Sequence, residues 1–335
     1  MLGNVAASNY NPKAADDLFN IIRGGSNEPN NFVPMYWLDF TDTGNLYQAQ
    51  NGTSQVTTND QYIRHVKNKV SFPGYSSSFT GGISTSTLPV GSHFISLADN
   101  DTTAPQFKTN VHNGLSAAYF DGDAGLYCSG NSPAEGALLE NPGCIFCGLS
   151  SNTTISPEFI SIWIIFKGTG NVSSDETLYS VSLPEAAGTG CGGTQNFYEF
   201  KLESSDDDYE FIAGQEGGAT TDFATNINAT TDVELWTYCG RNPSAGTARI
   251  YRDGDTSDGL SGQTASTEMM FNTSLGGLGT SNCQNHSLGC KVDSSKTFSQ
   301  HWTGHVFEYI AIEGVVNDTI RELIDNYFKG KYNIS

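Results

Sequence analysis

The sequence predicts an all-β fold of two antiparallel sheets, with a short helical arm at the N-terminus and a helix at the C-terminus. Three observations predict it. Apolar runs of strand length recur from residue 35 onward, and clusters of Gly, Ser, Thr and Asn separate them. The chain holds 37 glycines among 335 residues, which indicates many turns. Two runs are apolar on both faces, which is typical of central strands covered on each side.

The first 33 residues differ from the rest and predict an arm that contains a short helix. Asn11 is placed to cap this helix, and Pro12 would occupy its first position. Its apolar stripe consists of Leu18, Phe19, Ile21 and Ile22. Because a helix this short is not stable alone, we expect the stripe to dock on another chain or on a neighbouring copy. Packing on its own domain is the alternative.

Residues 34–335 are predicted to form one large β-sandwich domain. Its strand-like runs are MYWLDF, AAYFDG, FISIWIIF, NFYEFKL, DYEFIA, VELWTYC, ARIYRDGD and HVFEYIAI. FISIWIIF and HVFEYIAI are the two that are apolar on both faces. Stretches rich in Ser, Gly and Thr over 71–103 and 184–195 predict long loops, and loops on a rigid β scaffold often carry binding residues.

A helix is predicted over Asp318–Tyr332, with Asn317 as its N-cap. Its apolar residues recur at spacings of three and four, which places them on one stripe. The stripe consists of Ile320, Leu323, Ile324, Tyr327 and Phe328. We expect it to pack against the sandwich as part of the core.

The charge of the chain argues against two classes of partner. Asp and Glu outnumber Lys and Arg by 36 to 16, for a formal net charge of −20. Such a field repels phosphate backbones and anionic lipids, so neither nucleic acid nor a membrane surface is an expected partner. The N-terminus has no basic region followed by an apolar core, so we expect no classical signal peptide.

Seven cysteines are an odd number, so at least one has no partner within the chain. Cys144 and Cys147 form a Cys-x-x-Cys, and Cys283 and Cys290 flank a loop that holds His286. These residues suggest a zinc site. A second Cys-x-x-Cys is missing, so ordinary structural thiols are the favoured interpretation, and a Cys283–Cys290 disulfide stays open.

The order of these elements resembles the laminin-G-like, concanavalin A-like lectin/glucanase modules of phage structural proteins and bacterial surface proteins. The resemblance spans Met35 to Tyr332. It is carried by APQFKTNVHNGLSAAYFDGDAGLY, WLDF, NDQYIRHVKNK, YRDGD and the ending WTGHVFEYIAIEGVVNDTIRELIDNYFKGKY. The closing motif is the most specific part, with Gly304 and Glu308 in a strand before the helix. The resemblance implies a jelly-roll β-sandwich, a fold that does not by itself determine function.

Catalysis is not expected. The resemblance implies that a glucanase of this fold would carry clustered carboxylates along one strand. The nearest candidate is ESSDDDYE, from Glu203 to Glu210, which is typical of a solvated hairpin turn. Glu308 is expected to share a face with Val306, Ile310 and Ile312 and to be a buried hydrogen-bonding residue. A glycoside hydrolase of low probability is the alternative.

Two kinds of binding residue are candidates. The resemblance implies calcium in loop carboxylates, for which the candidates are Asp121, Asp123, Asp206 and Asp208. No other cofactor is expected. Three aromatic residues of the long loop, Phe72, Tyr75 and Phe79, are candidates for stacking on sugar rings. Their alternative role is to anchor this loop to the domain.

The leading hypothesis is a non-enzymatic virion structural protein. In this hypothesis a lectin-like sandwich is displayed on a phage or virus particle, as a capsid decoration or as a fibre or tail component. Its partners would be other virion proteins, reached through the N-terminal arm, together with further copies of itself and host or environmental glycans. The alternative is a glycan-active enzyme or adhesin outside the cell or on its surface.

Overall fold

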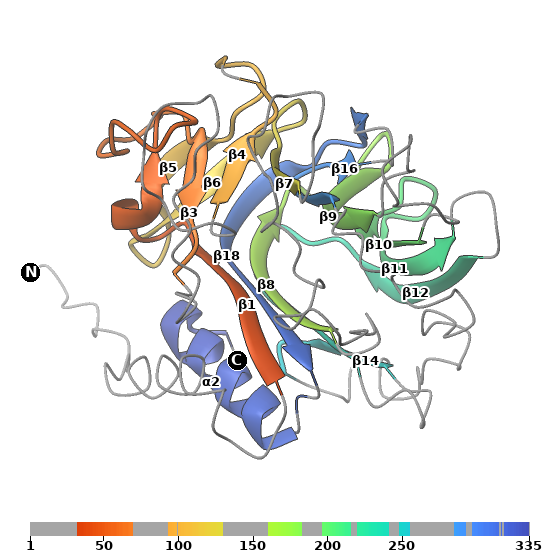
Figure 1. The fold of residues 1–335 in the computed structure, drawn as a ribbon. Coiled ribbons are helices and arrows are strands. Elements are labelled where there is room, and N and C mark those ends of the chain that lie inside the picture. Colours follow the sequence, from red (N-terminus) through yellow and green to blue (C-terminus); the bar gives the residue numbers. More distant parts are fainter. Residues whose placement is uncertain are drawn as a thin grey trace, which may run out of the picture.

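The computed structural model describes residues 32–69, 93–98, 100–129, 160–182, 196–215, 220–240, 248–254, 285–292, 297–314, 316 and 318–334. Two large antiparallel sheets pack face to face, and the helix α2 lies against the outside of one of them (Figure 1). The predicted β-sandwich is confirmed. Within these residues no helix has the length and apolar character needed to cross a membrane.

The first sheet has seven strands in the order β14-β13-β8-β18-β6-β5, with β1 paired to β18. Their bounds are β1 (Phe32–Asp39), β5 (Gln106–His112), β6 (Leu115–Asp121), β8 (Ile160–Gly168), β13 (Val233–Gly240), β14 (Ala248–Arg252) and β18 (Thr303–Gly314). The two runs that are apolar on both faces form β8 and β18, in the interior of this sheet as predicted.

The second sheet has nine strands in the order β12-β11-β10-β9-β15-β7-β4-β3-β2. Their bounds are β2 (Leu46–Tyr47), β3 (His65–Lys67), β4 (His93–Ser96), β7 (Leu126–Ser129), β9 (Glu176–Ser182), β10 (Asn196–Leu202), β11 (Asp208–Gln215), β12 (Thr220–Asn228) and β15 (Asn285–Leu288). Two short elements pair with each other beside it, β16 (Lys291–Val292) and β17 (Phe298–Ser299). A 3-10 helix, η1 (Thr43–Asn45), precedes β2.

The Asn-Gly turn predicted from the sequence joins β5 to β6. Asn113 and Gly114 have φ angles of 49° and 82°, the positive values that a two-residue hairpin turn of type I′ requires. The chain then leaves the first sheet, because β6 belongs to the seven-stranded sheet and β7 to the nine-stranded one. The second turn signal, at Gly122 with φ 92°, therefore lies where the chain crosses between the two sheets.

The prediction of a long loop over 71–103 was wrong near the C-terminal end of this stretch, where the strand β4 lies. Phe94 of β4 is 1% exposed and belongs to the core between the sheets, and the strand pairs with β3 and β7. Four residues are too few for a periodic signal, so pairing with neighbouring strands decides their structure. The predicted loop over 184–195 and residues 1–31 of the predicted arm lie outside the described residues.

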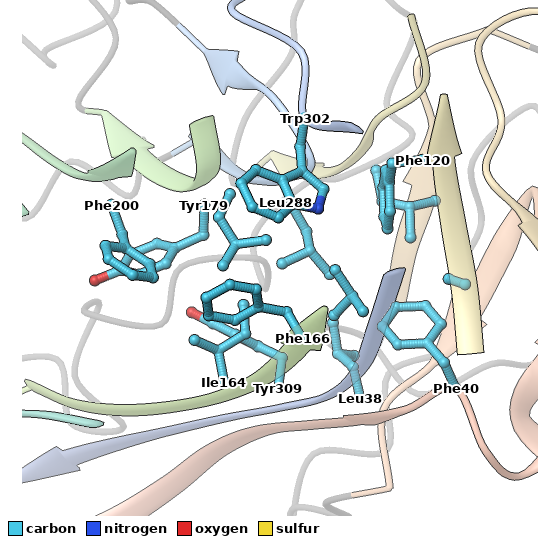
Figure 2. Close-up of a cluster of buried hydrophobic side chains, with 14 of the residues drawn as sticks. Leu38, Phe40, Phe120, Ile164, Phe166, Tyr179, Phe200, Leu288, Trp302 and Tyr309 are labelled. Atoms are coloured by element: carbon cyan, nitrogen blue, oxygen red, sulfur yellow. The ribbon is translucent and has the colours of Figure 1, made fainter. Parts of the chain in front are cut away.

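The core between the sheets is largely aromatic. Figure 2 labels ten of its residues, which come from both sheets and from the segments just after β1 and just before β18: Leu38, Phe40, Phe120, Ile164, Phe166, Tyr179, Phe200, Leu288, Trp302 and Tyr309. Phe166 lies edge-on to Trp302, with ring centroids 5.5 Å apart and planes at 89°. Such edge-to-face pairs add to the free energy gained from burying the rings.

The helix α2 (Asp318–Tyr332) has the predicted bounds, and its predicted stripe faces the seven-stranded sheet. Ile324, Tyr327 and Phe328 are buried in a second core, and the other two stripe residues are partly buried against it. Arg321 and Asp325 are buried as well, which a polar–apolar pattern does not predict. They are accommodated because they form an ion pair and because Asp325 accepts hydrogen bonds from Trp163 and Thr237 of the sheet.

His286 makes the stability of the fold depend on pH. It is 2% exposed in β15, its ring lies 5.9 Å from that of Tyr36, and burial lowers its pKa to about 3. The unfolded chain, with a histidine pKa of about 6.5, takes up the proton first as the pH falls. We expect this residue to remove about 2 kcal/mol of unfolding free energy between pH 7 and pH 5.

Urea denaturation of the wild type and of His286→Phe at both pH values measures this contribution. The difference in unfolding free energy between pH 7 and pH 5 should be about 2 kcal/mol smaller in the variant than in the wild type, whatever the variant's absolute stability. An identical pH dependence in both proteins would show that His286 is not buried in its neutral form.

Candidate functional site

The helix α2 covers only part of the outer face of the seven-stranded sheet. Ala117 of β6 and Ile165 of β8 are buried in the same core as the helix. Side chains two residues apart on a strand share a face, so Tyr119 and Lys167 point to this outer side too. Both are half-buried, which shows that this part of the sheet face is open to solvent.

Five half-buried side chains form a continuous cross-strand row on this open face. The register pairs Tyr62 with Gln106, Gln106 with Tyr119, Tyr119 with His305, and His305 with Lys167. We name these five residues the tyrosine–histidine row. Neighbouring residues on one face of a sheet lie close enough for their side chains to contact each other. The row therefore combines two phenol rings, an amide, an imidazole and an ammonium group on one surface.

Alternation within each strand determines which side chains reach the row. Phe120 of β6 and Phe166 of β8 are 0% exposed in the core between the sheets. Their chain neighbours Tyr119 and Lys167 must then point outward. The same residues that build the core therefore position the site.

Tyr119 is held in place from two sides. Its ring centroid lies 4.9 Å from that of His305, and the Lys108 ammonium lies 5.6 Å from the Tyr119 centroid. Lys108 itself donates to the side-chain oxygen of Gln106 at 2.6 Å and forms an ion pair with Asp60. These contacts restrict the tyrosine ring before any ligand arrives, which lowers the entropy cost of binding on it.

His305 is neutral at physiological pH. Partial burial and the charges of Lys167 and Lys108 lower its pKa to about 4. A neutral imidazole offers one hydrogen-bond donor and one acceptor. The row thus has both kinds of hydrogen-bonding group beside an aromatic ring.

The outer face of the nine-stranded sheet carries a different arrangement of charged side chains. We name it the ion-pair lattice, and it consists of Glu199, Lys201, Glu210 and Lys291. On β10, Phe200 and Leu202 point into the core, so the alternating Glu199 and Lys201 point outward. Glu199 accepts from the Lys291 ammonium at 2.7 Å and from Thr177.

The members of this lattice neutralise one another. Glu210 of β11 lies opposite Lys201, with 2.9 Å between ammonium and carboxylate. Burial opposes the charge of Lys201, but the hydrogen bond and charge of Glu210 outweigh it and raise the pKa of the lysine. Glu199, Lys201 and Glu210 are each less than 10% exposed, so the sheet does not present them to a ligand.

The lattice lacks what glycoside hydrolysis requires. A general acid must be accessible and must hold its proton near neutral pH. The lattice carboxylates Glu199 and Glu210 are instead buried, and each is paired with a lysine. The alternating charges of Glu199, Lys201 and Glu203 are a sequence signal for this lattice, which the predicted stretch from Glu203 to Glu210 includes only in part. As predicted, that stretch contains a hairpin turn, between β10 and β11.

Glu308 is a buried residue that accepts hydrogen bonds, as the sequence predicted. It is 0% exposed and lies between the seven-stranded sheet and α2. Trp37 donates its indole N–H to Glu308 and Tyr332 donates its hydroxyl, each at 2.7 Å, and Lys331 forms an ion pair with it. Buried behind the helix, it has no access to a substrate.

The predicted face of Glu308 needs one correction. Val306 belongs to the core between the sheets, whereas Ile310 and Ile312 belong to the core under the helix. A β-bulge between Val306 and Glu308 causes the difference, because an extra residue reverses the alternation beyond it. Glu308 therefore shares a face with the two isoleucines but not with Val306.

The four predicted calcium ligands lie in two separate turns. Asp121 accepts from the backbone N–H groups of Asp123 and Ala124, at 3.2 and 3.1 Å. Asp206 accepts from the backbone N–H of Asp208 at 3.3 Å. Over the described ranges, no three His, Cys, Asp or Glu side chains are grouped so that they would hold a metal ion. These bonds give Asp121 and Asp206 a role in stabilising their turns, and calcium binding stays a prediction.

Other predicted site residues lie outside the described residues. These are the loop aromatics Phe72, Tyr75 and Phe79, the arm residues Leu18, Phe19, Ile21 and Ile22, and the cysteines Cys144, Cys147 and Cys283. Cys290 is described, and burial raises the pKa of its thiol to about 12. A buried thiol of this kind is typical of a cysteine that fills the core.

The tyrosine–histidine row was missed from the sequence. One local signal for it exists, because Tyr119 stands between the apolar residues Ala118 and Phe120 and must take the opposite face. No local signal places Tyr119 beside His305 and Lys167, since the three belong to strands far apart in the sequence. Only the register between those strands reveals the row.

Comparison with known proteins adds a likeness of fold. No protein-family model and no curated protein sequence matches the chain. The solved structures similar to it include the carbohydrate-binding module (CBM40) of Ruminococcus gnavus IT-sialidase bound to α2,3 sialyllactose, at 13% identity and a TM-score of 0.35. This match covers 52% of the present chain and 83% of that chain.

Two full enzymes are also similar. The leech intramolecular trans-sialidase matches at 13% identity and a TM-score of 0.34, over 50% of the present chain and 22% of that chain. A GH54 α-L-arabinofuranosidase matches at 9% identity and a TM-score of 0.49, over 94% of the present chain and 65% of that one. At these identities and TM-scores, the ligands and activities of the three proteins carry no conclusion about this chain.

Proposed function

We propose that the chain is a non-catalytic glycan-binding module whose ligand lies on the tyrosine–histidine row. The observation that carries this proposal is an open sheet face on which a restrained tyrosine ring is flanked by hydrogen-bonding side chains. A sugar ring has an apolar C–H face that packs on an aromatic ring, and hydroxyls that need donors and acceptors. Tyr119 provides the first, and Gln106 and His305 provide the second.

The chemistry of the carboxylates supports a binding role over a catalytic one. Glu308 is sealed behind α2, and the carboxylates of the ion-pair lattice are buried and paired with lysines. The open row contains no carboxylate. A sugar bound there would contact hydrogen-bond donors, hydrogen-bond acceptors and an aromatic ring. Such groups bind a sugar but do not hydrolyse it.

The setting of this module is part of the proposal. We place it on the surface of a virion, with extracellular or cell-surface display as the alternative. The support is the sequence resemblance together with a net charge that disfavours nucleic acid and anionic membranes. Attachment through residues 1–33 belongs to the same proposal, with the qualification that Phe32 already starts β1 and pairs with β18.

Tyr119→Ala should weaken glycan binding about fivefold, because it removes an aromatic contact of the order of 1 kcal/mol. A glycan array identifies the ligand, and isothermal titration calorimetry then measures Kd for both proteins. Tyr47→Ala is the matched control, since Tyr47 is a half-buried tyrosine on the nine-stranded sheet whose ring lies 5.3 Å from His65. Equal Kd values for the wild type and a folded Tyr119→Ala protein, or no binding to any glycan, would contradict the proposal.

A further inference from the structure

We infer that the tyrosine–histidine row selects anionic glycans, carrying carboxylate or sulfate groups, over neutral ones. This inference rests on the proposed function, because it names the ligand class of the same site.

The first support is a local excess of positive charge. Lys167 lies at one end of the row. Lys108 belongs to β5, the strand next to β6, and its ammonium lies over the ring of Tyr119. Both lysines are close enough to His305 to act on its ionisation. Basic residues are scarce in this chain, 16 against 36 acidic ones. Two lysines around one histidine therefore give this open face a higher proportion of basic residues than the chain as a whole.

The second support is that one of these charges is uncompensated. Lys108 is paired with Asp60, but within the described part of the chain Lys167 has no ion-pair partner. His305 beside it is neutral at pH 7 and can donate an N–H. A carboxylate or sulfate between these two side chains would receive one ammonium charge and a hydrogen bond.

Among the described residues, Asp60 borders this surface paired with Lys108, and Asp121 borders it without an ion-pair partner. Asp121 is two residues beyond Tyr119 on the same strand face, and it is paired in register with Thr303 rather than with His305. Its carboxylate is already bonded to the backbone N–H groups of its own turn. The anionic group of a ligand is therefore expected on the Lys167 side of His305, away from Asp121.

The overall charge of −20 does not cancel this local effect. At physiological ionic strength, charges separated by more than about 8 Å are largely screened. The lysines that border the ligand therefore outweigh acidic residues elsewhere on the molecule. The same screening predicts that added salt reduces the preference for anionic glycans.

Three related probes test the inference on the full chain: a β-linked glucose tetrasaccharide, the same sugar with one 6-sulfate, and its counterpart with one glucuronic acid. We expect the wild type to bind at least one anionic form about five- to tenfold more tightly than the neutral form at low salt. The sulfated and uronic forms distinguish the two kinds of anion. Lys167→Gln should abolish the preference by weakening binding of the anionic sugars more than that of the neutral one, while Tyr119→Ala should weaken binding of all three.

Lys329→Gln is the matched control, because Lys329 is a half-buried lysine on α2, outside the row. It should keep the preference of the wild type. Equal binding of neutral and anionic sugars, or a preference that survives Lys167→Gln, would overturn the inference and leave glycan binding intact. Failure to bind any sugar would instead overturn the proposed function itself.

Discussion

Replacing Gly289 by alanine should lower the free energy of unfolding by about 2–5 kcal/mol, or prevent folding altogether. Gly289 follows β15 with φ 78°, a conformation that strains any residue with a Cβ atom. A Cβ atom there would lie 2.2 and 2.3 Å from two ring carbons of Phe120. That ring is fixed in the core, so the overlap cannot be relieved cheaply.

The same substitution at Gly330 is the control. Gly330 lies in α2 with no atom near the position of an added Cβ, so alanine should stabilise the protein by about 0.5–1 kcal/mol. Urea denaturation followed by tryptophan fluorescence measures both variants. Similar transition midpoints for Gly289→Ala and the wild type would mean that the segment after β15 does not pack on Phe120.

Glu308→Ala should destabilise the protein by about 3–5 kcal/mol, because it removes the nearest carboxylate of the buried Lys331 and the acceptor of two buried donors. The Lys331 side chain is 10% exposed and pairs with the Glu308 carboxylate and, at 3.5 Å, with that of Asp39. Trp37 and Tyr332 lose their acceptor in the same variant. The polar contacts that fasten the end of α2 to the sheet would therefore weaken together.

Two further variants isolate this effect. Glu322→Ala removes an exposed carboxylate from the same helix and should change stability by less than about 0.5 kcal/mol. Adding Lys331→Met to Glu308→Ala removes the buried ammonium that has lost its nearest carboxylate and should restore part of the lost stability. If Glu308→Ala behaved like Glu322→Ala, the buried ion pair would not be holding the helix to the sheet.

The parts of the fold that the sequence predicts are those with a local physical signature. The helix α2 is recognised because its apolar residues repeat at the helical period, and its end residues were predicted correctly. The β5–β6 hairpin is recognised because Asn113-Gly114 favours one turn type. Strands β8 and β18 are recognised as central because both of their faces are apolar.

The candidate site has no such signature. Tyr119, His305 and Lys167 meet because three strands from distant parts of the chain pair in one register, and register is a tertiary property. The bulge after Val306 shows how easily a pattern misleads, since one extra residue turns Glu308 toward the helix. The prediction of the loop aromatics as binding residues rests only on the general tendency of loops to carry binding residues.

A crystal structure of the protein with a bound oligosaccharide tests the central claim most directly. We expect a sugar ring packed on Tyr119, hydrogen bonds to His305 and Gln106, and, for an anionic sugar, its carboxylate or sulfate beside Lys167. A sugar bound instead over the nine-stranded sheet, at the lattice of Lys201 and Lys291, would contradict the central claim.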